Sequence, residues 1–311
     1  MDLGGTKIAL GAVAEDGSIL DTELLPTRAH RPASRIIDDI VSCVRQRWSE
    51  TVPASRPLGI GVAGQVDARG RVLFGPNLDW HDVPLAERLA RGTGRPVRVL
   101  NDVQAATFGE WRHGAGRRTD ALVCVFVGTG VGGGIVADGR LRHGATGTAG
   151  ELGHLTIEVA GRKCRCPNSG CLEAYAGGWA IAERAREAAR SDPRRGAPLV
   201  ALAGRPAAIT AKTVEEAYRR GDPLARRLMR ETERYLAAGL VSIVNGIDPA
   251  VIVLGGGIVS GFPWLVPAVD RVVRADALRA AVRGLRIVPA RLGGDSGLVG
   301  AATFAREAGA G

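Results

Sequence analysis

The first half of the chain alternates short apolar runs with longer segments whose apolar residues recur at helical spacing. Ile8–Ala14 and Ser18–Leu25 flank Asp16-Gly17 and predict a hairpin. Apolar residues spaced three and four apart predict a helix over Ala33–Trp48. Further strands are expected over Leu58–Ala63, Val97–Leu100 and Ala121–Val127, with a helix over Val103–Trp111. The strand over Ala121–Val127 is expected to end in a glycine-rich turn over residues 128–134.

The second half is richer in helical patterns. One long helix is expected over Cys171–Ala189 and another over Asp222–Asn245, with strands over Ala250–Leu254 and Leu285–Val288 and a last helix over Ser296–Arg306. This order predicts an α/β fold with mixed sheets flanked by helices. A chain of 311 residues is longer than most chains that fold around a single hydrophobic core, so two lobes are expected.

Composition adds little to this picture. Hydrophobic residues make up 45% and charged residues 23%, as in ordinary globular proteins. The sequence has neither a signal-peptide pattern nor an apolar run near the ~18 residues of a membrane span, so a soluble cytoplasmic protein is expected. The net charge of +9 comes from arginines that alternate with glutamates along predicted helices. This pattern is typical of solvated helix faces, and no nucleic-acid partner is expected.

Three of the five cysteines fall within eight residues, and a histidine precedes them by ten. Thiolate sulfur and imidazole nitrogen are preferred Zn²⁺ ligands, and four of them close a tetrahedral shell that leaves no position for a catalytic water. Core filling is the simpler explanation for Cys43 and Cys124, which lie in apolar runs, and a disulfide is a third alternative. A structural Zn²⁺ site is therefore predicted at His154, Cys164, Cys166 and Cys171.

Three glycine turns stand at predicted strand ends. Glycine lets backbone N–H groups approach a phosphate closely, although a single glycine pair is more often a simple hairpin turn. Neither the Walker pattern nor the dinucleotide fingerprint is present. The candidate phosphate-binding residues are Asp2, Gly4, Gly5, Thr6 and Lys7, then Gly128, Thr129 and Gly130, then Gly255, Gly256 and Gly257, with Asp2 able to hold a phosphate-bound Mg²⁺.

Asn101 and Asp102 follow an apolar strand directly and precede a predicted helix. Either residue could serve only as an N-cap, which stabilises a helix by ~1 kcal/mol. Alternatively, a carboxylate at this position could accept the proton of a hydroxyl that attacks a γ-phosphate.

Together these segments resemble the ROK family (repressor, open reading frame, kinase). The strongest element is Glu151-Leu-Gly-His154 followed by the C-x-C-x-x-x-x-G-C-L-E segment that ends at Glu173. The resemblance covers nearly the whole chain and implies a two-lobed actin-like ATPase (sugar kinase) fold. The implied lobes are residues 1–113 with 297–311, and residues 114–296.

The resemblance implies ATP-dependent phosphorylation of a hexose, most simply glucose at its 6-hydroxyl, with Asp102 as general base. The implied sugar contacts are Gly64, Asn77, Asn101, Asp102, Glu151, His154 and Glu173. ATP, Mg²⁺ and a structural Zn²⁺ are the implied cofactors, and a homodimer or homotetramer is the implied assembly. Two departures from the family pattern are the single residue before Asp2 and Pro167 after the second cysteine.

Other readings stay open. The family also contains kinases for N-acetylmannosamine, N-acetylglucosamine, fructose and allose, and the donor could be polyphosphate. It further contains sugar-sensing regulators with an N-terminal DNA-binding domain. The phosphate turn begins here at residue 2, so a kinase is preferred over a regulator.

Overall fold

The computed structural model describes residues 1–308, which form two compact units. The first unit comprises residues 1–120, 134–150 and those from 291 onward, and the second comprises residues 121–133 and 151–290. The expected lobes, 1–113 with 297–311 and 114–296, differ from these units chiefly in residues 134–150. Within that segment, the carbonyl oxygens of Gly147 and Ala149 accept hydrogen bonds from Gln104 of helix α3 (Asp102–Arg112), which belongs to the first unit.

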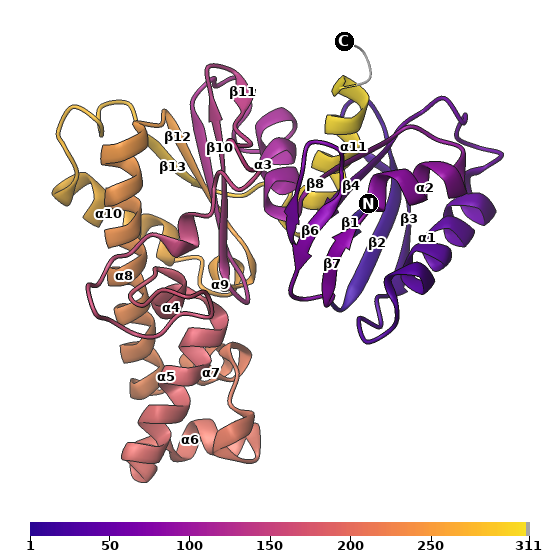
Figure 1. The fold of residues 1–311 in the computed structure, drawn as a ribbon. Coiled ribbons are helices and arrows are strands. Elements are labelled where there is room, and N and C mark those ends of the chain that lie inside the picture. Colours follow the sequence, from indigo (N-terminus) through magenta and orange to yellow (C-terminus); the bar gives the residue numbers. More distant parts are fainter. Residues whose placement is uncertain (309–311) are drawn as a thin grey trace. The chain divides into compact units, whose positions relative to one another are not determined.

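The first unit is built on a sheet of order β3-β2-β1-β4-β8 (Figure 1). Strand β1 pairs antiparallel with β2 and parallel with β4, and β4 pairs parallel with β8. A smaller sheet of order β5-β6-β7 belongs to the same unit. The strands of these two sheets are β1 (Asp2–Leu3), β2 (Lys7–Val13), β3 (Ile19–Pro26), β4 (Leu58–Val62), β5 (Gln65–Val66), β6 (Val72–Gly75), β7 (Trp80–Val83) and β8 (Val97–Asn101). Strand β11 (Arg140–Leu141) also lies in this unit but belongs to neither sheet.

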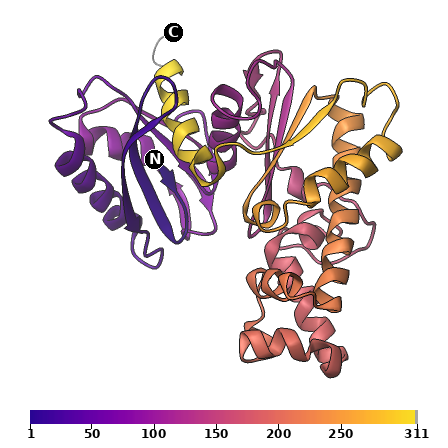
Figure 2. The ribbon, with the colours of Figure 1, turned by 180° about the vertical axis from the view of Figure 1, so that it is seen from behind.

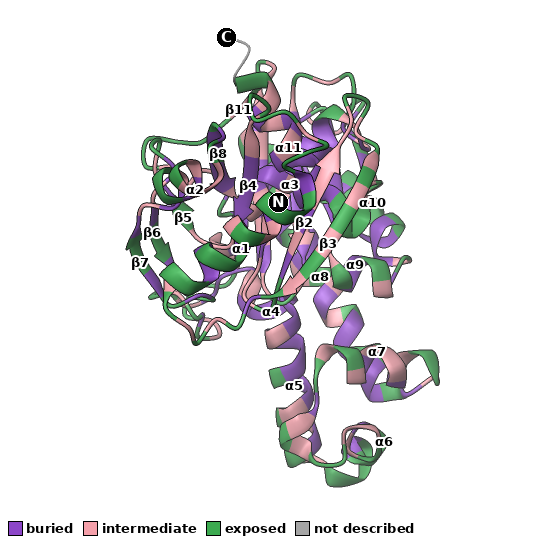
Figure 3. Ribbon diagram, turned by 90° about the vertical axis from the view of Figure 1, so that its right-hand side faces the viewer, coloured by how far each residue is buried: buried purple, intermediate pink, exposed green. Residues whose placement is uncertain are grey.

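Helices cover both faces of the larger sheet. On one face, α1 and α2 bury apolar residues such as Ile36, Ile40 and Leu89 against strand residues such as Leu3 and Ile60. The outward side of α1 is exposed (Figure 3). On the other face lie the helices α3 and α11. The helices of this unit are α1 (Ala33–Trp48), α2 (Leu85–Thr93), α3 (Asp102–Arg112), the 3₁₀ turn η3 (Gly293–Asp295) and α11 (Ser296–Ala308).

Helices α3 and α11 pack backbone against backbone. A Cβ added at Gly300 would lie 1.8 Å from the Ala105 carbonyl oxygen, and one at Gly109 would lie 2.4 Å from that of Ser296. Glu110 of α3 is fully buried and accepts hydrogen bonds from the backbone N–H groups of Ala115, Arg291 and Leu292. Its Oε1 also lies 3.0 Å from the Ser296 hydroxyl. The helix that begins at Asp102 is therefore fixed along its length.

In the second unit, β12 pairs parallel with both β9 and β13. Strands β9 and β12 are almost completely buried, as expected for parallel strands covered on both faces. Helices account for most of the remaining secondary structure of the unit (Figure 2). The elements are β9 (Leu122–Val127), η1 (Leu152–His154), α4 (Glu173–Ala176), α5 (Gly178–Ser191), α6 (Pro193–Ala203), η2 (Pro206–Ala208), α7 (Ala211–Arg219), α8 (Pro223–Ile247), β12 (Val251–Gly255), α9 (Gly257–Gly261), α10 (Leu265–Asp276) and β13 (Arg286–Pro289).

Two predictions about elements are wrong. The single helix expected over Cys171–Ala189 is two helices, because Gly177 is extended (ψ 148°) and turns the chain between them. The glycine-rich stretch after Val127 is only partly a turn, since Val131–Ala137 forms strand β10 and begins in the second unit. Glycine is unfavourable in strands and has no side chain to add to an alternating pattern, so the sequence did not indicate this strand. The predicted α/β class, the hairpin of β2 and β3 and the helix over 33–48 are confirmed.

No helix within residues 1–308 has both the length and the apolar character that a membrane crossing would need.

Candidate functional site

Predicted site residues of the first unit follow three neighbouring strands. Strands β1, β4 and β8 are parallel, with Leu3 paired to Val62 and Val62 paired to Asn101. Their carboxyl ends therefore lie at one edge of the sheet, where open α/β sheets bind ligands. Gly4 follows β1, Gly64 follows β4, and Asp102 follows β8.

Asn101 is the N-cap of α3. Its side-chain oxygen accepts hydrogen bonds from the backbone N–H groups of Val103 and Gln104. Its amide nitrogen donates to the Gly64 carbonyl oxygen at 3.1 Å. Asn101 therefore caps the helix, as one of the two interpretations of this residue predicted. Of the two N–H groups of its side-chain amide, one takes part in these contacts.

Asp102 is the first residue of α3. One carboxylate oxygen accepts a hydrogen bond from the N–H of Val103 at 2.9 Å. The positive end of the helix dipole favours an ionised carboxylate at this position. The side chain is half-buried, and a Cβ added at Gly61 would lie 3.3 Å from the Asp102 Cα atom. The sheet edge thus holds this carboxyl group in a defined position.

The first glycine turn packs against the turn that carries Asn77. The N–H of Gly4 donates to the Lys7 carbonyl oxygen at 3.1 Å, which closes the turn. A Cβ added at Gly5 would lie 2.8 Å from the Asn77 carbonyl oxygen, so no larger residue fits there. The structure therefore brings one predicted sugar residue beside the predicted phosphate turn.

Asp2 lies at the start of this edge. Burial raises the pKa of its carboxyl group, while the amino terminus and Lys7 act in the opposite direction. A Cβ added at Gly297, near the start of α11, would lie 3.2 Å from an Asp2 carboxylate oxygen. A buried carboxylate without a bound cation is costly, which suits the proposed role of Asp2 beside Mg²⁺.

In the second unit, two glycine turns follow the neighbouring parallel strands β9 and β12. Gly255 of β12 pairs with Phe126 of β9, so both turns lie at the same edge. Gly256 has φ 90°, and a Cβ there would lie 2.4 Å from the Val127 carbonyl oxygen. Both the left-handed conformation and the close approach require glycine. The turn over 128–130 is closed by a hydrogen bond from the N–H of Gly128 to the Gly130 carbonyl oxygen at 2.9 Å.

The four predicted metal ligands come together in the second unit. Their ligand atoms all lie within 4.8 Å of one another. Cys166 Sγ lies 3.6 Å from Cys171 Sγ, and Cys164 Sγ lies 3.7 Å from His154 Nδ1. Ligands at Zn–S distances of about 2.3 Å in a tetrahedron are about 3.8 Å apart, so the geometry fits Zn²⁺.

The chemistry of the cluster also favours a cation. Burial raises the pKa of Cys171 to about 12, and hydrogen bonds that its thiol donates to Cys166 and Cys164 contribute to this rise. Three thiolates in contact need a positive charge among them, which a bound Zn²⁺ would provide. The side chains fit a closed structural site with His154 as its fourth ligand.

Two carboxylates flank this cluster. Glu151 Oε2 lies 3.8 Å from His154 Nε2, on the side of the ring that does not face the sulfurs. Burial raises the pKa of Glu151, the neighbouring His154 lowers it, and the negative charge of Glu173 raises it further. Glu173 accepts hydrogen bonds from the Val131 N–H at 2.9 Å and from Trp179 Nε1 at 3.1 Å. The second unit thus gathers all three of its predicted sugar residues.

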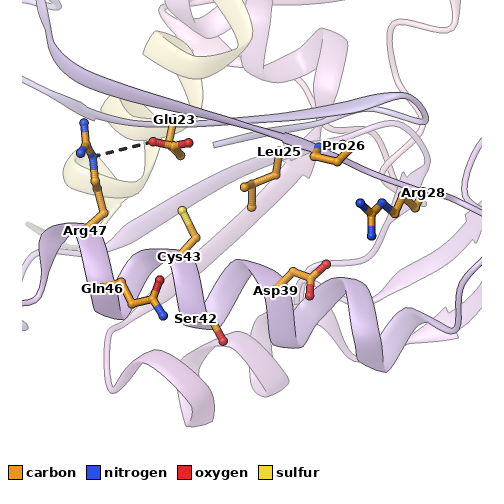
Figure 4. A pocket seen from close by; sticks show the side chains of 9 residues that line it. All are labelled: Glu23, Leu25, Pro26, Arg28, Asp39, Ser42, Cys43, Gln46 and Arg47. Carbon is orange, nitrogen blue, oxygen red and sulfur yellow. Dashed lines mark ion pairs between the residues drawn. The ribbon is translucent and has the colours of Figure 1, made fainter.

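A cavity of about 500 Å³ in the first unit has no connection with these residues. It lies between β3 and α1, where Glu23 and Leu25 face Cys43 and Arg47 (Figure 4). Glu23 and Arg47 form an ion pair with an N–O distance of 3.9 Å. None of the predicted site residues lines this cavity.

Sequence reasoning missed two side chains that support the site. Gln104 donates to the carbonyl oxygens of Gly147 and Ala149, and its own oxygen lies 3.0 Å from His143 Nδ1. Trp179 donates to Glu173. No local pattern points to either residue. The partners of Gln104 are distant in sequence, and Trp179 reaches Glu173 because the chain turns at Gly177 between them.

Comparisons with known proteins find similar sequences over nearly the whole chain. A sequence profile described as the ROK family matches residues 1–308. A glucokinase of Streptomyces coelicolor is 38% identical over 311 residues, covering 99% of this chain and 96% of the relative. An N-acetylmannosamine kinase of Vibrio cholerae is 31% identical over 311 residues, covering 99% and 98%.

A solved structure extends the likeness to the fold. The crystal structure of a ROK family glucokinase from Streptomyces griseus in complex with glucose and AMPPNP has a TM-score of 0.83. It is 39% identical and covers 98% of each chain. The actin-like sugar kinase fold expected from the sequence is thereby confirmed.

Proposed function

Because the chain belongs to the ROK family, we propose that it is an ATP-dependent hexose kinase that converts D-glucose to glucose 6-phosphate. The observation that carries the proposal is the position of Asp102, at the start of α3 and at the carboxyl end of β8. Glucokinases from two Streptomyces species, one of them solved with glucose and AMPPNP, support the choice of sugar and donor.

In the proposed reaction, Asp102 accepts the proton of the sugar hydroxyl as the oxygen attacks the γ-phosphorus atom of ATP. The bond between that phosphorus and the bridging oxygen breaks, and ADP leaves. The first glycine turn (Gly4, Gly5, Thr6 and Lys7) holds phosphate oxygens through N–H and side-chain donors. When bound beside Asp2, Mg²⁺ would neutralise charge on the phosphates.

The second unit supplies the other proposed contacts. Glu151, His154 and Glu173 accept or donate hydrogen bonds to sugar hydroxyls, with Asn77, Asn101 and Gly64 of the first unit in the same role. Residues 128–130 contact phosphate oxygens, and residues 255–257 lie along the adenosine. Zn²⁺, when bound by His154 and the three cysteines, would hold the His154 ring in a fixed orientation.

The experiment that tests the proposal is a coupled assay over a panel of sugars and donors. Glucose with ATP is expected to give the highest kcat/KM, and D102A should lose nearly all of it. A higher kcat/KM with N-acetylmannosamine would favour the second candidate, which the likeness to the Vibrio cholerae kinase supports. Turnover by D102A at the rate of the unchanged protein would overturn the role of Asp102.

A further inference from the structure

Trp179 touches three parts of the second unit that the proposed function uses. Its indole Nε1 donates to Glu173 Oε1 at 3.1 Å. Its backbone N–H donates to the Thr129 carbonyl oxygen at 2.9 Å. The guanidinium group of Arg165 lies over the indole ring, with its Cζ atom 4.7 Å from the ring centroid.

Each of these partners has its own place in the unit. Glu173 is a predicted sugar residue, and Thr129 lies in the second glycine turn. Arg165 stands between the metal ligands Cys164 and Cys166. We propose that Trp179 is a positioning residue that couples the metal loop to Glu173 and to the turn over 128–130. The proposal rests on the proposed function for the role of Glu173 but not for the coupling itself.

The break between α4 and α5 makes this arrangement possible. The extended Gly177 turns the chain so that the N–H of Gly178 donates to the Gly128 carbonyl oxygen, and that of Trp179 donates to Thr129. A Cβ added at Gly177 would lie 3.3 Å from the Gly130 Cα atom. The start of α5 therefore lies directly along the glycine turn.

Glu173 is held from two sides. Its Oε2 accepts from the Val131 N–H, and its Oε1 accepts from Trp179. A Cβ added at Gly130 would lie 2.3 Å from Oε2, so a side chain at position 130 would displace this carboxylate. Without the indole N–H, only one of the two donors would fix the Glu173 rotamer.

The guanidinium on the indole ring completes the coupling. A cation over the face of tryptophan is the most favourable cation–π pair. Trp179 also packs against the buried cluster that contains Cys164 and Cys171. A shift of the metal loop would move Arg165 and therefore the indole that orients Glu173.

The test compares W179F with W264F as a matched control. Phenylalanine keeps an aromatic face for Arg165 and removes only the N–H donor. Trp264 is also a half-buried tryptophan of the second unit, and within residues 1–308 its Nε1 has no hydrogen-bond partner. Hydrogen exchange of the Val131 amide is measured in both variants, together with KM for sugar, KM for ATP and kcat.

In W179F, the Val131 amide should exchange faster and KM for sugar should rise, each roughly tenfold, as expected for the loss of one hydrogen bond to a charged acceptor. KM for ATP should change less than KM for sugar, and W264F should match the unchanged protein. Chelation of zinc should accelerate Val131 exchange in the unchanged protein more than in W179F.

Unaltered Val131 exchange in W179F would overturn the proposal. If the unchanged protein phosphorylates no sugar, the proposed function fails, while the exchange data still decide the coupling. If W179F does not fold, R165Q takes its place, since it keeps the indole N–H and removes the cation. A two- to threefold faster Val131 exchange in R165Q would then support the coupling, and unchanged exchange would refute it.

Discussion

The amide nitrogen of Asn101 donates to the carbonyl oxygen of Gly64 at 3.1 Å, while its oxygen caps helix α3. One side chain therefore fixes both the start of the helix that carries Asp102 and the backbone that follows β4. This contact links capping, which is a matter of stability, with the geometry of the proposed active site.

Replacing Asp102 with asparagine is the most direct test of the proposed base. Asparagine keeps the shape of the side chain and a carbonyl oxygen for the Val103 N–H, but it cannot accept the sugar proton. We expect kcat to fall roughly 10²–10⁴-fold while the sugar still binds. Steady-state kinetics and equilibrium binding of the sugar measure the two effects. A full loss of sugar binding would point instead to a structural role.

Substitutions of Asn101 separate its two contacts. Serine is as good an N-cap as asparagine but cannot reach Gly64, so N101S should keep the stability of the first unit and raise KM for sugar. Alanine loses the cap as well and should lower the free energy of unfolding by about 1 kcal/mol. Urea unfolding and kinetics of both variants provide the measurement. Equal KM values in N101S and the unchanged protein would show that the Gly64 contact has no part in binding.

Local sequence patterns predict a large part of this structure. The metal ligands lie within 18 residues of one another, and Asn101 and Asp102 stand directly between a strand and a helix. Such features depend on neighbours in sequence, so spacing reveals them. The hairpin of β2 and β3 and the helix over 33–48 are readable for the same reason.

Contacts between distant residues could not be read in this way. Glu110 meets Arg291, which is 181 positions away, and Gln104 meets Ala149 across 45 positions. The role of Trp179 depends on the turn at Gly177. The amphipathic pattern continues across this turn, so the sequence predicts one uninterrupted helix and gives no sign of the turn. Strand β10 contains three consecutive glycines, whose weak strand preference indicated a turn.

The buried carboxylate of Glu110 should be essential for stability. It accepts from three backbone N–H groups, and glutamine would place an NH₂ group against some of these donors. We expect E110Q to lower the free energy of unfolding by about 2–4 kcal/mol. The control is E87Q on α2, because Glu87 forms only an exposed pair with Arg91 and should change stability by less than about 0.5 kcal/mol. Similar unfolding curves for E110Q and E87Q would contradict this assignment.

Removal of one metal ligand should affect the second unit selectively. C166S is expected to lose bound zinc and to raise KM for sugar, because the loop that carries His154 is no longer held. C43S is the matched control, since Cys43 lies on α1 of the first unit. Zinc content by elemental analysis and kinetics of both variants check the expectation. A zinc-free C166S protein with unchanged KM would refute a supporting role for the metal.

His113 should make the stability of the first unit depend on pH. The Thr303 hydroxyl donates to the Val299 carbonyl oxygen and lies 3.0 Å from His113 Nε2, within hydrogen-bonding distance. Burial lowers the pKa of His113, and the charges of Arg306 and Arg117 lower it further, while Glu307 and a hydrogen bond to the Asp16 backbone act in the opposite direction.

The sign of the effect follows from proton linkage. As pH falls below the ordinary histidine value of about 6.5, the unfolded chain binds a proton before the folded one does, so the free energy of unfolding falls. The contribution of His113 is complete above that pH and decreases until the lowered folded pKa is reached. H113Q keeps an N–H donor for Thr303 and does not titrate. Urea unfolding from pH 7.5 to 5.5 should show a steeper loss of stability in the unchanged protein than in H113Q, and parallel curves would rule out this contribution.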